Sequence, residues 1–171
     1  PVASLSGGLK RAVDIIRGII HQPDILILDE PTIGLDLPNR LRIWKFIKDL
    51  QNSSGLTVIL TTHYLDEAEP CDNVGFINSG RIIREGNPQN LVEELSNYVL
   101  EFCGKQMMKN RLIDILGNHL DIDGTIYFKC SDKNLNLVTQ LHNEFREEIE
   151  AWQIRRPTLN DVFLWTMKKA D

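Results

Sequence analysis

The stretch ILILDEPTIGLD, residues 25–36, decides the fold of the first part of this sequence. It opens with four consecutive apolar side chains, rich in β-branched isoleucine, which is typical of a short strand buried in a parallel sheet. Two carboxylates, Asp29 and Glu30, follow the strand directly, and Asp36 is suited to cap a helix that begins after it. The stretch therefore predicts a buried strand, a turn that carries two acids, and a capped helix.

The segments on both sides of this stretch complete an α/β unit. Apolar residues recur at helical spacing over residues 9–20, before the strand. After Asp36 a second helix runs to the polar break at residues 53–55, and the apolar run at residues 56–62 predicts a second strand that ends at His63. A strand, a helix and another apolar strand predict a right-handed crossover and a parallel sheet that helices cover on both faces.

The second half of the sequence has a different pattern. Residues 73–86 predict a hairpin that turns at residues 79–80. Beyond it, the order strand, helix, hairpin around residues 123–124, helix, strand and final helix predicts a small α+β domain of the ferredoxin-like βαββαβ type. We therefore expect two domains, at residues 1–96 and 97–171.

Composition narrows the possible function classes. The 171 residues include 42% hydrophobic and 25% charged side chains, which is ordinary for a globular chain. The formal net charge of −5 argues against a protein that binds nucleic acid through a broad basic face. No apolar run approaches the roughly 20 residues of a membrane-spanning helix. The three cysteines lie far apart in the sequence, which favours structural thiols over a disulfide framework or a zinc site.

Asp29, Glu30 and His63 are candidates for a phosphate-handling site. A carboxylate at a strand end can help to hold Mg²⁺ beside a phosphate, because Mg²⁺ keeps several waters and needs few protein ligands. Side chains alternate along a strand, so Glu30 points away from Asp29 and can act as a general base toward water. His63 follows the next strand at the same sheet edge, where a neutral imidazole can hydrogen-bond a phosphate. Taken singly, a solvated acid pair and a structural histidine are open alternatives.

Ser6, Gly7 and Gly8 form a second candidate site at the start of the first helix. Free backbone N–H groups, a hydroxyl and the positive end of the helix dipole suit the binding of an anion. The alternative interpretation is a plain helix cap at Ser6.

Together, these features resemble the nucleotide-binding subunit of ATP-binding cassette (ABC) transporters. LSGG at residues 5–8 is similar to the family signature, and ILILDE at residues 25–30 is similar to the Walker B strand with its catalytic glutamate. IGLD at residues 33–36 resembles the D-loop, and TTH at residues 61–63 resembles the segment that carries the switch histidine. The resemblance covers roughly residues 1–95.

The resemblance implies a fold and a reaction. The fold class is α/β: part of a P-loop NTPase parallel sheet with flanking helices, followed by the small α+β domain. The implied reaction is hydrolysis of ATP with Mg²⁺. Asp29 would hold Mg²⁺ through water, and Glu30 and His63 would be catalytic.

The resemblance also implies partners. In the family two cassettes sandwich ATP head to tail, so Ser6, Gly7 and Gly8 would contact ATP bound by the partner in trans, and Asp36 would lie at the dimer interface. A homodimer is expected, bound to a transmembrane permease at the inner, cytoplasmic face of the cell membrane, with no nucleic acid involved. The ending RRPTLNDVFLW, residues 155–165, looks like the accessory C-terminal domain of the drug- and polysaccharide-export branch.

Two family elements are missing from these residues. No G-x-x-x-x-G-K-[ST] phosphate-binding loop (Walker A) occurs in the sequence, and neither does the Q-loop. We therefore expect the C-terminal portion of an ABC ATPase, which alone hydrolyses no ATP. Two alternatives stay open: an ABC ATPase of the DNA-repair or translation type, and a natively short, non-enzymatic regulatory or binding module.

Overall fold

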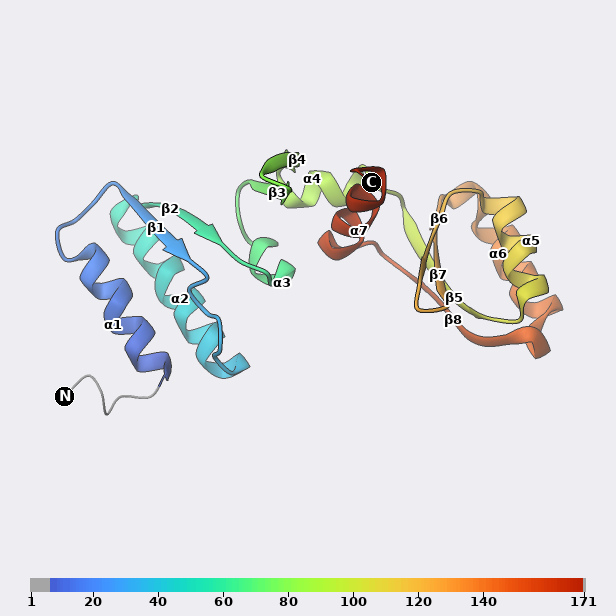
Figure 1. Cartoon of the computed structure of the whole chain (residues 1–171), viewed down its shortest axis with the longest axis horizontal. Helices are drawn as coiled ribbons and strands as arrows, with labels where there is room; N and C mark the ends of the chain where they lie inside the picture. Colours follow the sequence, from blue (N-terminus) through green and yellow to red (C-terminus); the bar gives the residue numbers. More distant parts are fainter. Residues whose placement is uncertain (1–6, 171) are drawn as a thin grey trace. The chain divides into compact units, whose positions relative to one another are not determined.

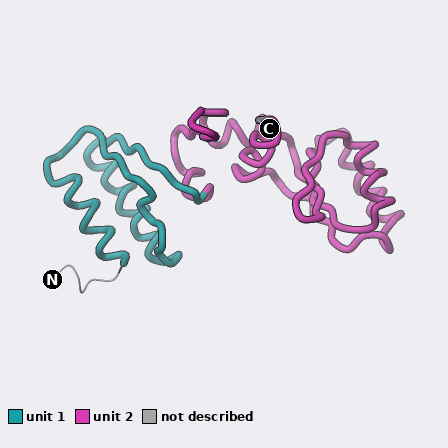
Figure 2. The backbone as a smooth tube through the Cα atoms, viewed as in Figure 1, with its two compact units in different colours: residues 1–64 teal, residues 65–171 magenta. Residues whose placement is uncertain are grey.

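A computed structural model describes residues 7–170, and it contains two compact units, described over residues 7–64 and 65–170 (Figures 1 and 2). None of the helices between residues 7 and 170 combines the length and the hydropathy needed to cross a bilayer. The elements of the first unit are α1 (Gly7–Ile19), β1 (Ile25–Asp29), α2 (Leu37–Ser54) and β2 (Thr57–Thr61).

The first unit is built on a two-stranded parallel sheet. β1 and β2 pair in register from Ile25 opposite Thr57 to Asp29 opposite Thr61, which confirms the predicted parallel pairing. α1 and α2 pack on one face of these strands. The core between them consists of Ile15, Leu26, Ile43, Ile47 and Leu56.

The other face of this sheet is uncovered. Ile25, Ile27 and Ile59 are 54%, 73% and 53% exposed. The prediction of helices on both faces is therefore wrong for residues 7–64. Both helices lie on the face of Leu26, and strand alternation turns the odd-numbered isoleucines away from them.

The cap predicted at Asp36 is confirmed. Its Oδ1 accepts a hydrogen bond from the backbone N–H of Asn39 at 3.0 Å, and Pro38 lies in the first turn of α2. At the other end, Gly55 adopts the left-handed conformation (φ 69°) and donates its N–H to the carbonyl of Gln51 at 3.0 Å. Both ends of α2 are thus set by local sequence.

The second unit contains a four-stranded antiparallel sheet in the order β6-β7-β5-β8, and this order confirms the ferredoxin-like βαββαβ prediction. Both predicted hairpin turns are present, each with two consecutive positive φ angles, at Ser79–Gly80 and Asp123–Gly124. The elements are α3 (Leu65–Ala68), β3 (Val74–Asn78), β4 (Arg81–Gly86), α4 (Pro88–Glu93), β5 (Tyr98–Gly104), α5 (Gln106–Leu116), β6 (His119–Ile122), β7 (Thr125–Cys130), α6 (Asp132–Glu144), a 3₁₀ turn (Arg146–Glu148), β8 (Ile149–Arg155) and α7 (Leu159–Ala170).

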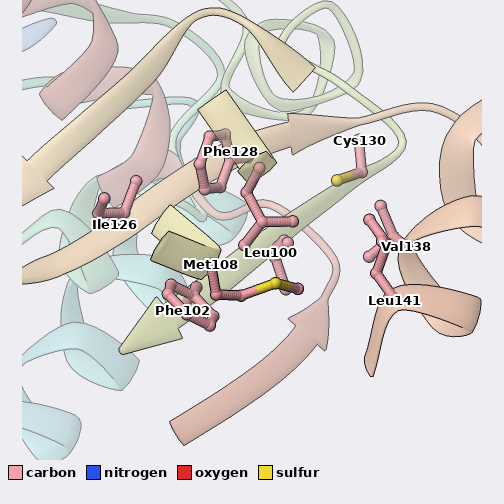
Figure 3. Close-up of a cluster of buried hydrophobic side chains, with 9 residues drawn as sticks. Leu100, Phe102, Met108, Ile126, Phe128, Cys130, Val138 and Leu141 are labelled. Carbon is pink, nitrogen blue, oxygen red and sulfur yellow. The ribbon is translucent and has the colours of Figure 1, made fainter. Parts of the chain in front are cut away.

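Each face of this sheet has its own core. α5 and α6 cover the face of Leu100 and Phe102 (Figure 3). Burial there raises the pKa of the Cys130 thiol to about 11, and all three cysteines of the chain are free thiols. The opposite core joins α7 to residues from the sheet, β3 and α4: Phe76, Leu91, Leu95, Val99, Leu120, Leu159, Val162 and Trp165.

Residues 65–96 pack with the C-terminal part of the chain. α3 and α4 both contact α7, and Phe76 meets Phe163 edge to face with ring centroids 5.5 Å apart. The compact unit therefore begins at Leu65. The expected domains at residues 1–96 and 97–171 stay a prediction about which segments belong to the family ATPase.

A buried ion pair attaches α7 to the sheet. The guanidinium of Arg155 donates to Asp161 through Nη1 at 2.6 Å and Nη2 at 2.9 Å, and its Nε donates to Glu101 Oε1 at 2.5 Å. Asp161 is fully buried and also accepts from the backbone N–H and the hydroxyl of Thr158, which closes the first turn of α7. One arginine thus links β5, β8 and α7.

Replacing Asp161 by Asn should destabilise the chain by about 3 kcal/mol, because the guanidinium of Arg155 would lose its buried counter-charge. Urea unfolding followed by circular dichroism measures the change. Asp114→Asn, an exposed carboxylate on α5, is the matched control and should shift the free energy of unfolding by less than about 0.5 kcal/mol. Equal effects of the two substitutions would contradict a special role for the pair.

The same pair predicts an acid-dependent loss of stability. Burial alone would raise the pKa of Asp161, but hydrogen bonds from Arg155 and Thr158 and the arginine charge outweigh it and hold this pKa below its ordinary value of 3.8. The contribution is therefore present above the ordinary pKa and is lost as the pH falls from there through the lowered folded-state value. The difference in free energy of unfolding between the native chain and Asp161→Asn should therefore become smaller as the pH falls. The difference between the native chain and Asp114→Asn should not change in this way.

Candidate functional site

The carboxyl ends of β1 and β2 bring Asp29 and Thr61 together. The two residues are opposite each other in the parallel register, and the hydroxyl of Thr61 donates to Asp29 Oδ1 at 2.5 Å. Within residues 7–170, no hydrogen-bond donor lies on the other oxygen, Oδ2. One side of the Asp29 carboxylate is therefore fixed by the protein, and the other side faces outward.

Glu30 is held immediately beyond the strand. Its backbone N–H donates to the carbonyl of Thr61 at 3.2 Å and to the Thr61 hydroxyl at 3.1 Å. Its carbonyl accepts from Ile33 at 3.3 Å, which closes a turn. The φ angle of Glu30 is +46°, in the left-handed region that side chains rarely adopt. These bonds hold the backbone in a conformation that turns the Glu30 side chain away from the strand direction.

His63 meets Glu30 at this edge. Its Nε2 lies 3.0 Å from Glu30 Oε1, as expected if both follow neighbouring parallel strands. The His63 side chain is 83% exposed, whereas that of Glu30 is 21% exposed. The carboxylate is thus partly enclosed, and the imidazole stands in solvent where a ligand can reach it.

The donor set at Asp29 fits Mg²⁺. Over the described residues, no group of three or more His, Cys, Asp or Glu side chains is arranged to enclose a metal ion. Mg²⁺ does not need such a cage, because it keeps several waters and takes further oxygen ligands from substrate phosphates. One outward carboxylate oxygen of Asp29 is the kind of ligand that Mg²⁺ uses in this way.

The second candidate site lies at the start of α1. Ser6 is outside the described residues, whereas Gly7 and Gly8 form the first turn. A Cβ atom at Gly8 would come within 3.0 Å of the Asn39 side chain, so the start of α1 lies against the start of α2, which Asp36 caps. Among the described residues, no hydrogen bond or ion pair joins this pair of helix starts to Asp29, Glu30 or His63. The two candidate sites are separate in this chain.

Sequence reasoning missed Thr61. Its hydroxyl touches both Asp29 and the backbone of Glu30, which makes it the central hydrogen-bonding group of the edge. A signal for Thr61 was present in the sequence. β1 and β2 have equal lengths, and when two such strands pair in parallel from their first residues, Thr61 at the end of the second strand lies opposite Asp29 at the end of the first.

Comparisons with known proteins place the chain near ATP-binding proteins of ABC transporters. A family model described as "ABC transporter" matches residues 1–33. The chain is 37% identical over 169 residues to the Nod factor export ATP-binding protein I of Bradyrhizobium diazoefficiens, across 95% of this chain and 53% of the relative. It is 33% identical over 171 residues to the daunorubicin resistance ATP-binding protein DrrA3 of Streptomyces coeruleorubidus, across 95% and 54%. The chain spans about half the length of these relatives.

A solved structure gives the same result for the fold. The chain resembles cbiO1 from Clostridium perfringens, described as part of the ABC transporter complex cbiONQ, with a TM-score of 0.51 and 33% identity over 67% of this chain and 41% of that chain. The α/β arrangement of strands and flanking helices is therefore that of an ABC cassette. The relatives and the fold together show that the chain is similar to ABC transporter ATP-binding proteins over most of its length.

Proposed function

We propose that this chain is part of the ATPase subunit of an ABC exporter. In this proposal Asp29, Glu30 and His63, at the carboxyl ends of β1 and β2, carry out the hydrolysis of ATP. The observation that supports this most is the contact of 3.0 Å between His63 Nε2 and Glu30 Oε1, beside the outward carboxylate of Asp29. A partly enclosed acid paired with an exposed imidazole suits the activation of a water next to a phosphate.

Each side chain at this edge has a distinct role in the proposal. Glu30 accepts a proton from the attacking water. The N–H of a neutral His63 hydrogen-bonds the Glu30 carboxylate before ATP binds, and donates to the terminal phosphate when ATP is present. Asp29 holds Mg²⁺, directly or through a water. When bound, Mg²⁺ neutralises charge that develops on the phosphate oxygens. Positioned proton transfer of this type contributes about 10²–10⁴ to a rate.

Thr61 is a positioning residue in this proposal. Its hydroxyl fixes one oxygen of Asp29 and accepts from the backbone of Glu30, so both acids keep their geometry before nucleotide arrives. Preorganised groups of this kind need no rearrangement during the reaction. Thr61 itself does not touch the substrate.

A second cassette is the proposed partner at the start of α1. Gly7 and Gly8, with Ser6 before them, would bind the phosphates of ATP held by that cassette, and Asp36 would lie at the interface. Gly7 and Gly8 support this, because neither carries a side chain that would screen the N–H groups in the first turn of α1. The dimer would in turn act on a transmembrane permease at the cytoplasmic face of the membrane.

The export direction rests on the relatives. Both bear names that concern export or drug resistance, and both align over 95% of this chain, including the α+β region. We also propose that the 171 residues alone do not turn over ATP, because they include no Walker A loop to hold the nucleotide.

Glu30→Gln tests the proposed base. In a polypeptide that contains both this sequence and a Walker A loop, the substitution should keep ATP binding and lower turnover by about a thousandfold. Asp49→Asn, an exposed carboxylate on α2, removes the same charge and should leave turnover unchanged. Phosphate release and nucleotide-binding assays separate the two effects. Turnover near the native rate in Glu30→Gln would exclude Glu30 as the base.

Thr61→Val tests the positioning role without requiring activity. Loss of the hydroxyl should lower the local stability of β1 and β2 by about 1–2 kcal/mol, because two hydrogen bonds are removed. Thr61→Ser keeps the hydroxyl and should lose much less. Hydrogen exchange of the β1 and β2 amides measures both variants, and indistinguishable exchange would show that the hydroxyl holds nothing in place.

A further inference from the structure

A cavity of about 360 Å³ lies in the second unit, whereas Asp29, Glu30 and His63 belong to the first. Its lining residues come from β4 and α7: Ile83, Arg84, Thr166 and Lys169. The volume is within the range of sites that hold small molecules, at the low end.

Two cations line this cavity, and a third lies against the helix that forms one of its walls. Arg84 and Lys169 line it, and Lys129 of β7 lies nearby, with its Nζ 5.3 Å from the ring centre of Trp165 on α7. Burial lowers the pKa of Lys129, and the neighbouring charges of Lys169 and then Arg84 lower it further. Arg84 and Lys169 line the same cavity, so an anion between them would relieve the repulsion between their charges.

The protein supplies little negative charge in return. Arg84 pairs with Glu94 through Nη2 and Oε2 at 2.9 Å, and Glu94 is 65% exposed. Over residues 7–170, neither Lys129 nor Lys169 takes part in an ion pair. The hydroxyl of Thr166 donates to the carbonyl of Val162 at 2.7 Å, so the cations are the donors open to a ligand. Glu94 is thus the one carboxylate that forms an ion pair with any of the three cations among the described residues.

We propose that this cavity binds a phosphate group, presented by a small phosphorylated molecule or by a lipid headgroup. A phosphate monoester brings close to two negative charges, which three cations opposed by one carboxylate can hold, and arginine and lysine are the residues that bind such groups. Ile83 offers an apolar contact for the carbon atoms next to the phosphate. The proposal involves the second unit alone and is independent of ATP hydrolysis.

Two binding assays on the whole 171-residue chain distinguish the sources of phosphate. Calorimetric titration with glycerol 3-phosphate tests the free form. Co-sedimentation with phosphatidylcholine vesicles, with and without phosphatidic acid, tests the lipid form. Binding in either assay supports the proposal and names the source, and both should weaken as the salt concentration rises. Absence of binding in both assays would overturn it.

Variants locate the binding. Lys169→Ala and Arg84→Gln should each weaken it by about tenfold or more, as expected for a lost charge-assisted hydrogen bond. Glu94→Gln removes the competing carboxylate and should strengthen it. Lys133→Ala, an exposed lysine on α6 at the other face of the sheet, is the charge-matched control and should have no effect. Because Lys169 is exposed, its variant should keep the native circular dichroism spectrum. Equal weakening by Lys133→Ala and Lys169→Ala would reduce the effect to net charge and overturn the proposal.

Discussion

The parallel register of β1 and β2 is the constraint on which the candidate catalytic edge depends. Pairing Asp29 with Thr61 places the hydroxyl on the carboxylate, anchors the backbone of Glu30, and brings His63 within hydrogen-bond distance of the Glu30 side chain. A shift of one residue would turn Thr61 to the other face of the sheet and break these contacts together. The register that buries Leu26 against the helices is therefore the same register that positions Asp29, Glu30 and Thr61 at the strand ends.

The second unit depends on a different kind of constraint. Its sheet is apolar on both faces, so each face needs its own cover, and the two covers come from different parts of the chain. α5 and α6 are local to the βαββαβ order, whereas α7 returns after the last strand and is attached by Arg155 and Asp161. The cations around the proposed phosphate cavity meet only because α7 returns in this way, beside β4 and β7.

Features with a local signal were predictable from the sequence. The two-residue turns at Ser79–Gly80 and Asp123–Gly124, the cap at Asp36 and the succession of helices and strands along the chain all follow from residues close together in sequence. The uncovered sheet face was not predicted, because an apolar strand looks the same whether one face or both are covered. The Thr61 hydrogen bonds and the cluster of Arg84, Lys129 and Lys169 were missed because they join residues far apart in sequence. The roles of Asp29, Glu30 and His63 remain predictions.

The late position of α7 has a consequence for how the chain is made. Leu91 and Phe76, which lie well before the end of the chain, share a core with Leu159, Val162 and Trp165 of α7. During synthesis β3, β4 and α4 leave the ribosome before α7, so their apolar side chains stay exposed to water until α7 has emerged. This segment is therefore the natural place for a chaperone to bind during synthesis, and a premature stop before residue 159 would leave it permanently exposed to quality-control proteases.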